Sequence, residues 1–420
     1  ILKKKVDTIA QMESETNEFD IQKKVLAHLH KVQAKLKTTS DKDKIMREAR
    51  ELFYDKHFIE EQDSKPYLLG FTNGVFDFQE NKFRPGRPDD YIVKSTKYDY
   101  KPKHMCNPEH IIEVEQFIEQ LFPVVELREY MWEHLASTLI GTNENQTFNI
   151  YTGSGRNGKS MLVILMGKVL GDYKGTVPVT LITQKRTQIG GTSSELVALK
   201  GVRYAVMQEP SKGDKINEGI MKELTGGDPL QCRALFCNSI TYIPQFKLVC
   251  CLNELFEIVS QDDGTWRRIR VCDFKSKFTE NPVSNDPDEP YQFKVNKKLE
   301  EKFNEWKVAM MSILIEKAKE TNGNVNDCSI VLSKSQEYRE GQDYIYQFIK
   351  EKIIESEGST VKKREVAQEF REWYQTNYGN KGKDIRDKEL YKYMIKYYGA
   401  YKAGGWKNIS IIYEDYEDGI

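Results

Sequence analysis

Long apolar runs, closely paired cysteines and an excess of charge of one sign are all missing from this sequence of 420 residues. No apolar run approaches the roughly 18 residues that a membrane-spanning helix needs, and no secretory signal pattern opens the chain. The formal net charge is -1 although 30% of the residues are charged, so any site for a polyanion must be local. We therefore expect a soluble protein that is not secreted and makes no membrane contact.

The seven cysteines contain no C-x-x-C pair, and four of them lie in apolar, strand-like segments. We interpret them as reduced core residues of a protein in a reducing compartment. His104, Cys106 and His110 are close together, but their spacing fits no zinc template and Pro108 interrupts it, which disfavours a metal site there. Because the chain begins with Ile1 rather than Met, we expect a piece of a longer polypeptide.

Residues 153–160 read G-S-G-R-N-G-K-S and satisfy every fixed position of the phosphate-binding pattern G-x-x-x-x-G-K-[ST]. A β-prone run at 147–150 precedes the segment and an apolar run at 161–170 follows it, which predicts a strand, a glycine loop and a buried helix. In such a P-loop, backbone N–H groups face phosphate oxygens, Lys159 reaches the β- and γ-phosphates and the Ser160 hydroxyl binds Mg²⁺. We predict ATP and Mg²⁺ as cofactors. The nucleotide-binding residues would be Gly153, Ser154, Gly155, Arg156, Asn157, Gly158, Lys159 and Ser160.

Two later strand-like runs end in polar side chains. Residues 203–207 are followed by Gln208 and Glu209, and residues 247–252 are followed by Asn253. At a strand end beside the P-loop, Glu209 would hold Mg²⁺ or orient the attacking water, and Asn253 would sense the γ-phosphate or position that water. A strand-end glutamate that simply faces solvent is the alternative for Glu209.

Arg267 and Arg268 follow a turn further along the chain. A planar, permanently charged guanidinium suits the charge that develops on a transferring phosphoryl group, especially when a neighbouring subunit supplies it. By itself, a pair of arginines is weak evidence for such a role.

Taken in order, these motifs resemble those of the superfamily 3 helicases, and more narrowly the primase-helicase group of poxviruses, other large DNA viruses and some phage plasmids. The P-loop, Glu209, the segment 224–233, Asn253 and the arginine pair fill the family's positions. Asn73-Gly-Val-Phe-Asp77 also resembles the signature of the domain that precedes the helicase in that family. Many members carry two adjacent acids where this chain has Gln208 and Glu209. Glu209 could therefore either bind the metal or activate the water, and both roles stay open.

The resemblance implies a homo-oligomer, a hexameric ring that binds ATP between subunits and translocates on single-stranded DNA. It places the protein in the host cytoplasm, at a site of viral replication. It also allows a primase domain upstream of residue 1, since no closely spaced catalytic acidic pair stands out in this chain.

A candidate nucleic-acid element spans residues 224–244, where a tight turn at 225–228 would shape a hairpin that projects into the ring channel. Four residues would contact the nucleic acid by charge, stacking and hydrogen bonding: Arg233, Phe236, Asn238 and Lys247. Such contacts suit single-strand binding that does not depend on the base sequence. A surface hairpin without a ligand is the alternative.

The predicted fold class is an α/β P-loop ATPase that is AAA+-like and has a parallel sheet as its core. A helical N-terminal domain and collar precede this core, and an α+β domain that resembles a winged helix follows it. We expect a long helix over 291–319 and a C-terminal domain whose lysines meet DNA or stay solvated on a packing module. The expected domains are 1–105 (helical and small β), 106–145 (collar), 146–325 (ATPase core) and 330–420 (C-terminal domain).

The function that these patterns favour is an ATP-dependent DNA helicase, the ring motor of a viral primase-helicase. A P-loop kinase and a DNA-packaging ATPase are alternatives among enzymes, and a nucleic-acid-binding assembly protein that does not hydrolyse ATP is the alternative outside enzymology. ATPase activity measured with and without single-stranded DNA separates them.

Overall fold

The computed structural model describes residues 17–413 except 185–191, 209–214, 254, 259–261, 285, 380–386 and 403. Glu209 therefore lies outside the described residues. The chain divides into two units, residues 1–59 and 60–420. Within the first unit, α2 (Asn17–Lys37) and α3 (Thr39–Leu52) confirm the predicted helical N-terminal region, and no side chain of α3 is buried.

The second unit begins with α4 (Phe58–Glu61) at its boundary and a small antiparallel sheet of β1 (Leu68–Phe71), β2 (Gly74–Asp77) and β3 (Lys82–Arg84). β1 and β2 pair as the hairpin that the Asn-Gly step predicts. Two short 3-10 helices, η1 (Pro88–Asp90) and η2 (Lys103–Met105), follow.

The residues of the N-G-V-F-D segment have structural contacts in this small sheet. Asn73 hydrogen-bonds the backbone of Tyr100 through both its amide oxygen and its amide nitrogen. Asp77 is buried and pairs with Arg84, whose guanidinium also meets Asp90 at 2.8 Å. The hydrogen bond from Arg84 is the main cause of the lowered pKa of Asp90. The segment thus builds a turn and one end of a buried ion-pair network.

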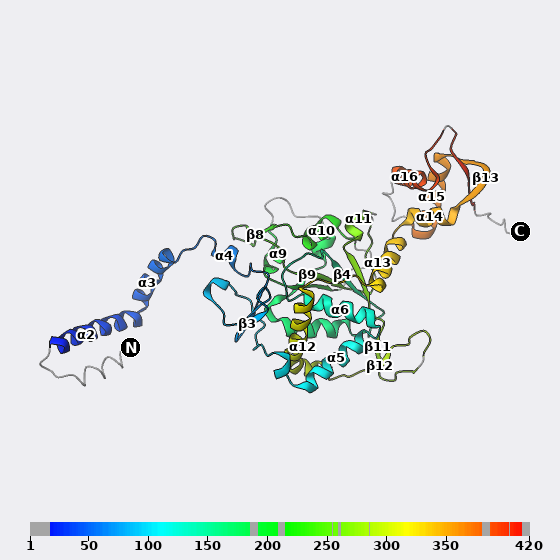
Figure 1. The fold of residues 1–420 in the computed structure, drawn as a ribbon. Coiled ribbons are helices and arrows are strands. Elements are labelled where there is room, and N and C mark those ends of the chain that lie inside the picture. Colours follow the sequence, from blue (N-terminus) through cyan, green and yellow to red (C-terminus); the bar gives the residue numbers. More distant parts are fainter. Residues whose placement is uncertain are drawn as a thin grey trace. The chain divides into compact units, whose positions relative to one another are not determined.

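The core of the second unit is a sheet of five parallel strands in the order β10-β4-β9-β6-β5. Its strands are β4 (Phe148–Thr152), β5 (Lys174–Val177), β6 (Tyr204–Gln208), β9 (Lys247–Cys251) and β10 (Ile269–Asp273). Helices cover both faces, which explains why the central strands β4, β9 and β6 are buried along most of their length (Figure 1). The predicted fold class is confirmed for this core.

One face of the sheet carries α5 (Pro108–Leu121), α6 (Val125–Ser137), α7 (Lys159–Leu170) and α12 (Leu299–Thr321), with α12 in contact with the other three (Figure 1). η3 (Gly171–Tyr173) follows α7. The predicted collar helices therefore pack on the core of their own chain. The other face carries α8 (Thr180–Thr183), α9 (Ser194–Ala198), α10 (Glu218–Thr225) and α11 (Asp263–Trp266).

The helix predicted from residue 291 begins later than expected. Gln292–Lys294 forms β12, which pairs in parallel with β11 (Lys277–Thr279). Phe293 packs on Phe278 across this pair, with ring centroids 5.8 Å apart. Pairing with the preceding strand, β11, therefore overrides the helical pattern at the start of this segment.

A buried polar junction joins the amino ends of β6 and β9 to the segment before β1. The guanidinium of Arg203 is 2% exposed and donates to the carbonyl oxygens of Lys65, Pro66 and Leu68. A Cβ at Gly141 would overlap with this guanidinium, so the close approach requires glycine there. Backbone carbonyls therefore anchor a buried cation at this junction.

After the sheet, α13 (Ser329–Gly341) packs on β10, where the Ser335 hydroxyl accepts a hydrogen bond from the Val271 N–H at 3.0 Å. A separate hydrophobic cluster begins at Ile345 and includes Phe348, Phe370 and Trp406. By its packing, α13 goes with the sheet, although it lies beyond the 330 boundary.

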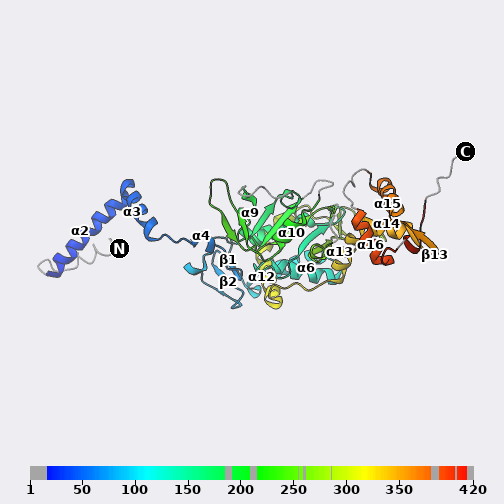
Figure 2. The ribbon, with the colours of Figure 1, turned by 90° about the horizontal axis from the view of Figure 1, so that it is seen from above.

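The C-terminal part consists of α14 (Tyr344–Lys352), β13 (Ile353–Val361), α15 (Lys363–Tyr378), α16 (Asp387–Tyr398) and β14 (Trp406–Ile411), seen together in Figure 2. α14 ends at Lys352 because Ile353 pairs with Ile411 in the antiparallel β13-β14 ladder. The winged-helix assignment stays a prediction.

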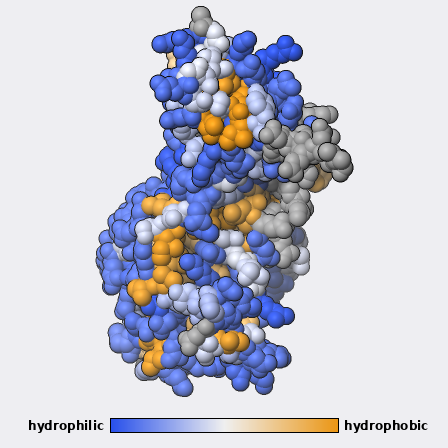
Figure 3. All heavy atoms as spheres, turned by 90° about the vertical axis from the view of Figure 1, so that its right-hand side faces the viewer, coloured by the Kyte–Doolittle hydropathy of each residue, from blue (hydrophilic) through white to orange (hydrophobic). Residues whose placement is uncertain are grey.

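Among the described residues, no helix combines the length and apolar character that crossing a membrane requires. On the face drawn in Figure 3, hydrophobic side chains form separate patches between hydrophilic ones.

Candidate nucleotide-binding site

The glycine loop lies between β4 and α7, as its pattern predicts. Gly158 has φ +82° and forms the N-cap of α7, and a Cβ there would overlap with the side chain of Leu121. Gly153 and Gly155 also have positive φ values, of +149° and +90°. The loop and the amino end of α7 line one space, an arrangement that favours a bound anion.

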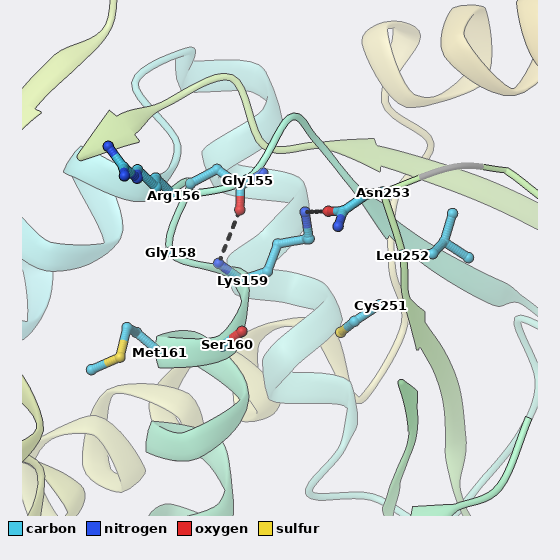
Figure 4. A pocket seen from close by; sticks show the side chains of 10 residues that line it. Gly155, Arg156, Gly158, Lys159, Ser160, Met161, Cys251, Leu252 and Asn253 are labelled. Carbon is cyan, nitrogen blue, oxygen red and sulfur yellow. Dashed lines mark hydrogen bonds between the residues drawn. The ribbon is translucent and has the colours of Figure 1, made fainter. Parts of the chain in front are cut away.

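Lys159 is the first residue of α7, and its ammonium group crosses this space. It donates to the carbonyl oxygen of Gly153 at 3.0 Å. It also donates to the Oδ1 of Asn253 at 3.1 Å, the contact that Figure 4 shows. The side chain is buried, which lowers the pKa of the ammonium group from its ordinary value. The two residues therefore meet although they are 94 positions apart, because β4 and β9 are neighbours in the sheet.

A cavity of about 300 Å³ opens at this place, lined by residues 155–161 and 251–253. Ser160 is exposed at its wall, and Figure 4 shows its hydroxyl on the first turn of α7. The Nδ2 of Asn157 is buried and has no hydrogen-bond partner among the described residues, so the loop holds one more donor than its own contacts use. The chemistry of the loop fits a triphosphate with its Mg²⁺.

Sequence reasoning missed three residues that line the cavity, Met161, Cys251 and Leu252. Their signal was position: Cys251 and Leu252 immediately precede Asn253, and Met161 immediately follows the motif. Burial raises the pKa of the Cys251 thiol to about 12, so the thiol stays protonated at neutral pH.

Of the two residues predicted to bind a metal, Ser160 lies within the described residues and Glu209 does not. Gln208 ends β6 and pairs in register with Cys251, so the chain reaches the P-loop edge of the sheet directly before Glu209. The position of Glu209 itself lies outside the described residues. In the part of the chain that is described, no group of three His, Cys, Asp or Glu side chains could hold a metal ion, and this includes His104, Cys106 and His110.

The arginine pair lies at the amino ends of the strands, whereas the P-loop lies at their carboxyl ends. Arg268 directly precedes β10, whose Ile269 pairs with Phe148 at the start of β4, whereas the P-loop follows Thr152 at its end. Strands of this length separate the two edges by roughly 13 Å, at about 3.3 Å per residue. Arg267 and Arg268 therefore do not meet Lys159 of their own chain, and neither lines its cavity.

The candidate nucleic-acid hairpin exists as the antiparallel pair β7 (Leu230–Cys232) and β8 (Ile240–Tyr242). The turn predicted at 225–228 is wrong, because Thr225 ends α10 and Gly226 is its C-cap. Residues 233–239 connect the two strands instead, from Arg233 through Phe236 to Asn238. Phe236 is 98% exposed and has φ +60°, and Asn238 is exposed beside it.

The prediction that Lys247 contacts a nucleic acid is wrong. It begins β9, is only 6% exposed, and donates to the carbonyl oxygens of Ile140, at 2.9 Å, and Thr142. Burial lowers the pKa of its ammonium group to about 7. A side chain held in the interior by two carbonyls cannot reach a nucleic acid on the surface, so its role is structural.

A parallel sheet with a glycine loop at one strand end, and a lysine that meets an asparagine at the next strand end, defines a protein of the P-loop class. Residues 2–123 match the family model described as "D5 N terminal like". The chain is 34% identical over 372 residues to "Putative helicase L207/L206" of Acanthamoeba polyphaga mimivirus, covering 86% of this chain and 38% of that protein. It is 28% identical over 381 residues to "Putative primase C962R" of African swine fever virus (strain Badajoz 1971 Vero-adapted), covering 86% and 39%.

These similarities to proteins named as a putative helicase and a putative primase of large DNA viruses confirm the resemblance seen in the motifs. The chain spans less than two fifths of the length of these relatives. A likeness to the solved structure of the NrS-1 C terminal region has 12% identity and a TM-score of 0.41 over 65% of this chain and 59% of that one, too weak to bear on function.

Proposed function

We propose that this chain is the ATP-dependent DNA helicase motor of a viral primase-helicase, which works as a hexameric ring of identical copies on single-stranded DNA. The observation that carries the proposal is the meeting of Lys159 with Asn253 in a cavity of P-loop chemistry. The similarity to proteins named as a putative helicase and a putative primase of large DNA viruses supports the same function.

ATP with Mg²⁺ would supply the phosphoryl group and its charge neutralisation when bound. Lys159 would then give up the Gly153 carbonyl and the Asn253 amide for phosphate oxygens, which are stronger partners for an ammonium group. Release of Asn253 leaves its amide available to orient water. We assign Ser160 and Glu209 to the metal, and Glu209 alternatively to activation of the water.

The position of the arginines supports a site that two copies share. Both belong to the edge of the sheet opposite the P-loop, and Arg267 is exposed there. A guanidinium in this place can meet a γ-phosphate only if that phosphate is bound to another copy. A ring, in which each copy has two neighbours, satisfies this condition for every subunit.

The hairpin supports a contact with single-stranded DNA. An almost fully exposed aromatic ring at the end of a two-stranded ladder offers a stacking surface for a base without selecting its sequence. Arg233 and Asn238 lie in the same connection and would add charge and hydrogen bonding.

ATPase activity, measured with and without single-stranded DNA, tests the proposal. We expect turnover that single-stranded DNA stimulates, and we expect Lys159→Ala to abolish it because the phosphate charge loses its main counter-charge. Lys168→Ala is the matched control, since Lys168 is exposed in the last turn of the same helix and lies outside the cavity.

Other outcomes favour the other functions. Tight ATP binding without turnover in the wild-type protein would support an assembly protein, and stimulation by duplex DNA rather than by single strands would support a packaging ATPase.

A further inference from the structure

Gln146, a residue with no role so far, holds both candidate arginines at once. Its Oε1 accepts hydrogen bonds from the Nη2 of Arg267 at 2.9 Å and from the Nη2 of Arg268 at 3.1 Å. One neutral amide oxygen thus lies between two guanidinium groups that repel each other. The contact joins the loop before β4 to the turn before β10.

The backbone of Gln146 has an uncommon conformation. Its φ is +49°, in the left-handed region that side chains other than glycine seldom adopt, and its N–H donates to the carbonyl oxygen of Asn143 at 3.1 Å. The turn thereby directs the side chain toward the arginines. A residue kept in this region at a candidate site motivates a functional hypothesis.

The two arginines are not equivalent. Arg268 is partly buried, and its Nη1 donates to the carbonyl oxygen of Gly264 at 2.5 Å. Its own carbonyl oxygen accepts from the Phe148 N–H at 2.7 Å, which ties it to the first residue of β4. Arg268 is therefore built into the turn between α11 and β10.

Arg267, in contrast, is exposed. Among the described residues, Gln146 is the hydrogen-bond partner of its guanidinium. Breaking one hydrogen bond to a neutral oxygen releases this side chain, while releasing Arg268 would disturb the turn.

We propose that Gln146 is a positioning residue that holds Arg267 ready for the nucleotide of the neighbouring copy, and that Arg268 is the structural anchor of the pair. The inference rests on the proposed function, because it needs a nucleotide bound between two copies. A neutral amide suits this role because it orients the guanidinium, yet it yields to a phosphate, which offers a charge-assisted and bidentate contact. A carboxylate in the same position would compete with the phosphate.

Gln146→Glu tests this directly. We expect kcat for ATP to fall by at least about tenfold, because the new carboxylate retains Arg267, while KM and the thermal unfolding temperature stay close to those of the wild type. Gln116→Glu is the matched control, since it makes the same chemical change at an exposed position on α5.

Mixing of subunits separates this role from a local structural defect. Gln146→Glu copies keep an intact P-loop, and Lys159→Ala copies keep an intact arginine, so mixed assemblies should recover activity that neither variant has alone. Recovery should also appear when Arg267→Ala copies are mixed with Lys159→Ala copies. Arg268→Ala should lower the unfolding temperature, which Arg267→Ala should leave unchanged.

Wild-type kcat in Gln146→Glu, or loss without recovery on mixing, would overturn the inference and leave the proposed function standing. Full activity in Arg267→Ala would overturn it as well. A wild-type protein that shows no turnover would instead overturn both.

Discussion

At the scale of single residues, burial decides the role of most titratable groups near the sheet. His134 on α6 is 1% exposed, and its Nε2 lies 2.8 Å from the Tyr151 hydroxyl. Burial lowers the pKa of this imidazole to about 3. Lys247 is another example, whose buried amino group donates to the carbonyl oxygens of Ile140 and Thr142. These residues stabilise the core and take no part in the chemistry.

We predict that His134 makes the protein sensitive to acid. Between the ordinary pKa of 6.5 and the lowered value of about 3, the unfolded chain binds a proton that the folded chain does not bind. The free energy of unfolding should therefore decrease as the pH is lowered through this range. The contribution of this residue is up to about 1.4 kcal/mol per pH unit. Urea unfolding at pH 7, 6 and 5 should give a shallower pH dependence for His134→Gln than for the wild type.

The exposed His104 supplies the control, because His104→Gln should keep the wild-type slope. Identical slopes for His134→Gln and the wild type would contradict the prediction.

At the scale of elements, the same strand can present one functional end and one structural end. The carboxyl end of β9 delivers Cys251 and Asn253 to the cavity, while its amino end buries Lys247 in the junction with residues 140–142. The hairpin β7-β8 differs from both ends of β9, because the connection between its strands is open to solvent and Phe236 is exposed there.

For this hairpin, Phe236→Ala should leave the unfolding temperature unchanged and weaken binding of single-stranded DNA. Loss of one stacked base is worth roughly 1–3 kcal/mol, or about five- to 150-fold in Kd. Fluorescence anisotropy with a labelled oligothymidylate measures this change. Ile243→Ala removes a similarly exposed apolar side chain, 57% exposed next to β8, and should have no such effect. Equal Kd values for Phe236→Ala and the wild type would rule out stacking at this position.

At the scale of the whole molecule, the sheet separates the P-loop from the two candidate arginines. The P-loop follows the carboxyl end of β4 and the arginines precede the amino end of β10, so in the proposed mechanism a single copy cannot complete the site by itself. Assembly is then a requirement of the proposed ATPase and not only a device for enclosing DNA.

It follows that ATPase activity per subunit should rise with protein concentration. We expect the rise to coincide with the formation of assemblies in light scattering, because each new interface completes one site. Arg267→Ala should show low activity at every concentration, even where assemblies form. Full specific activity at a concentration where light scattering gives the monomer mass would refute the shared site.

Local patterns alone were enough to predict several parts of the molecule. The glycine loop between strand and helix, the Asn-Gly hairpin of β1 and β2, the helices predicted as a collar and the strand before Asn253 all follow from residues adjacent in the chain. In each case the signal is a motif or a periodicity that spans only a few residues, so no distant contact is needed to recognise it.

Only the tertiary structure decided where Lys247 points, where the hairpin turns and what Gln146 contacts. Thr225 to Asp228 has turn chemistry, but that chemistry ends α10 and leaves the hairpin connection to residues 233–239. Gln146 meets arginines more than 100 positions away because β4 and β10 pair side by side. Such contacts depend on which strands become neighbours, and this depends on the packing of the whole core, so no local pattern of residues can express it.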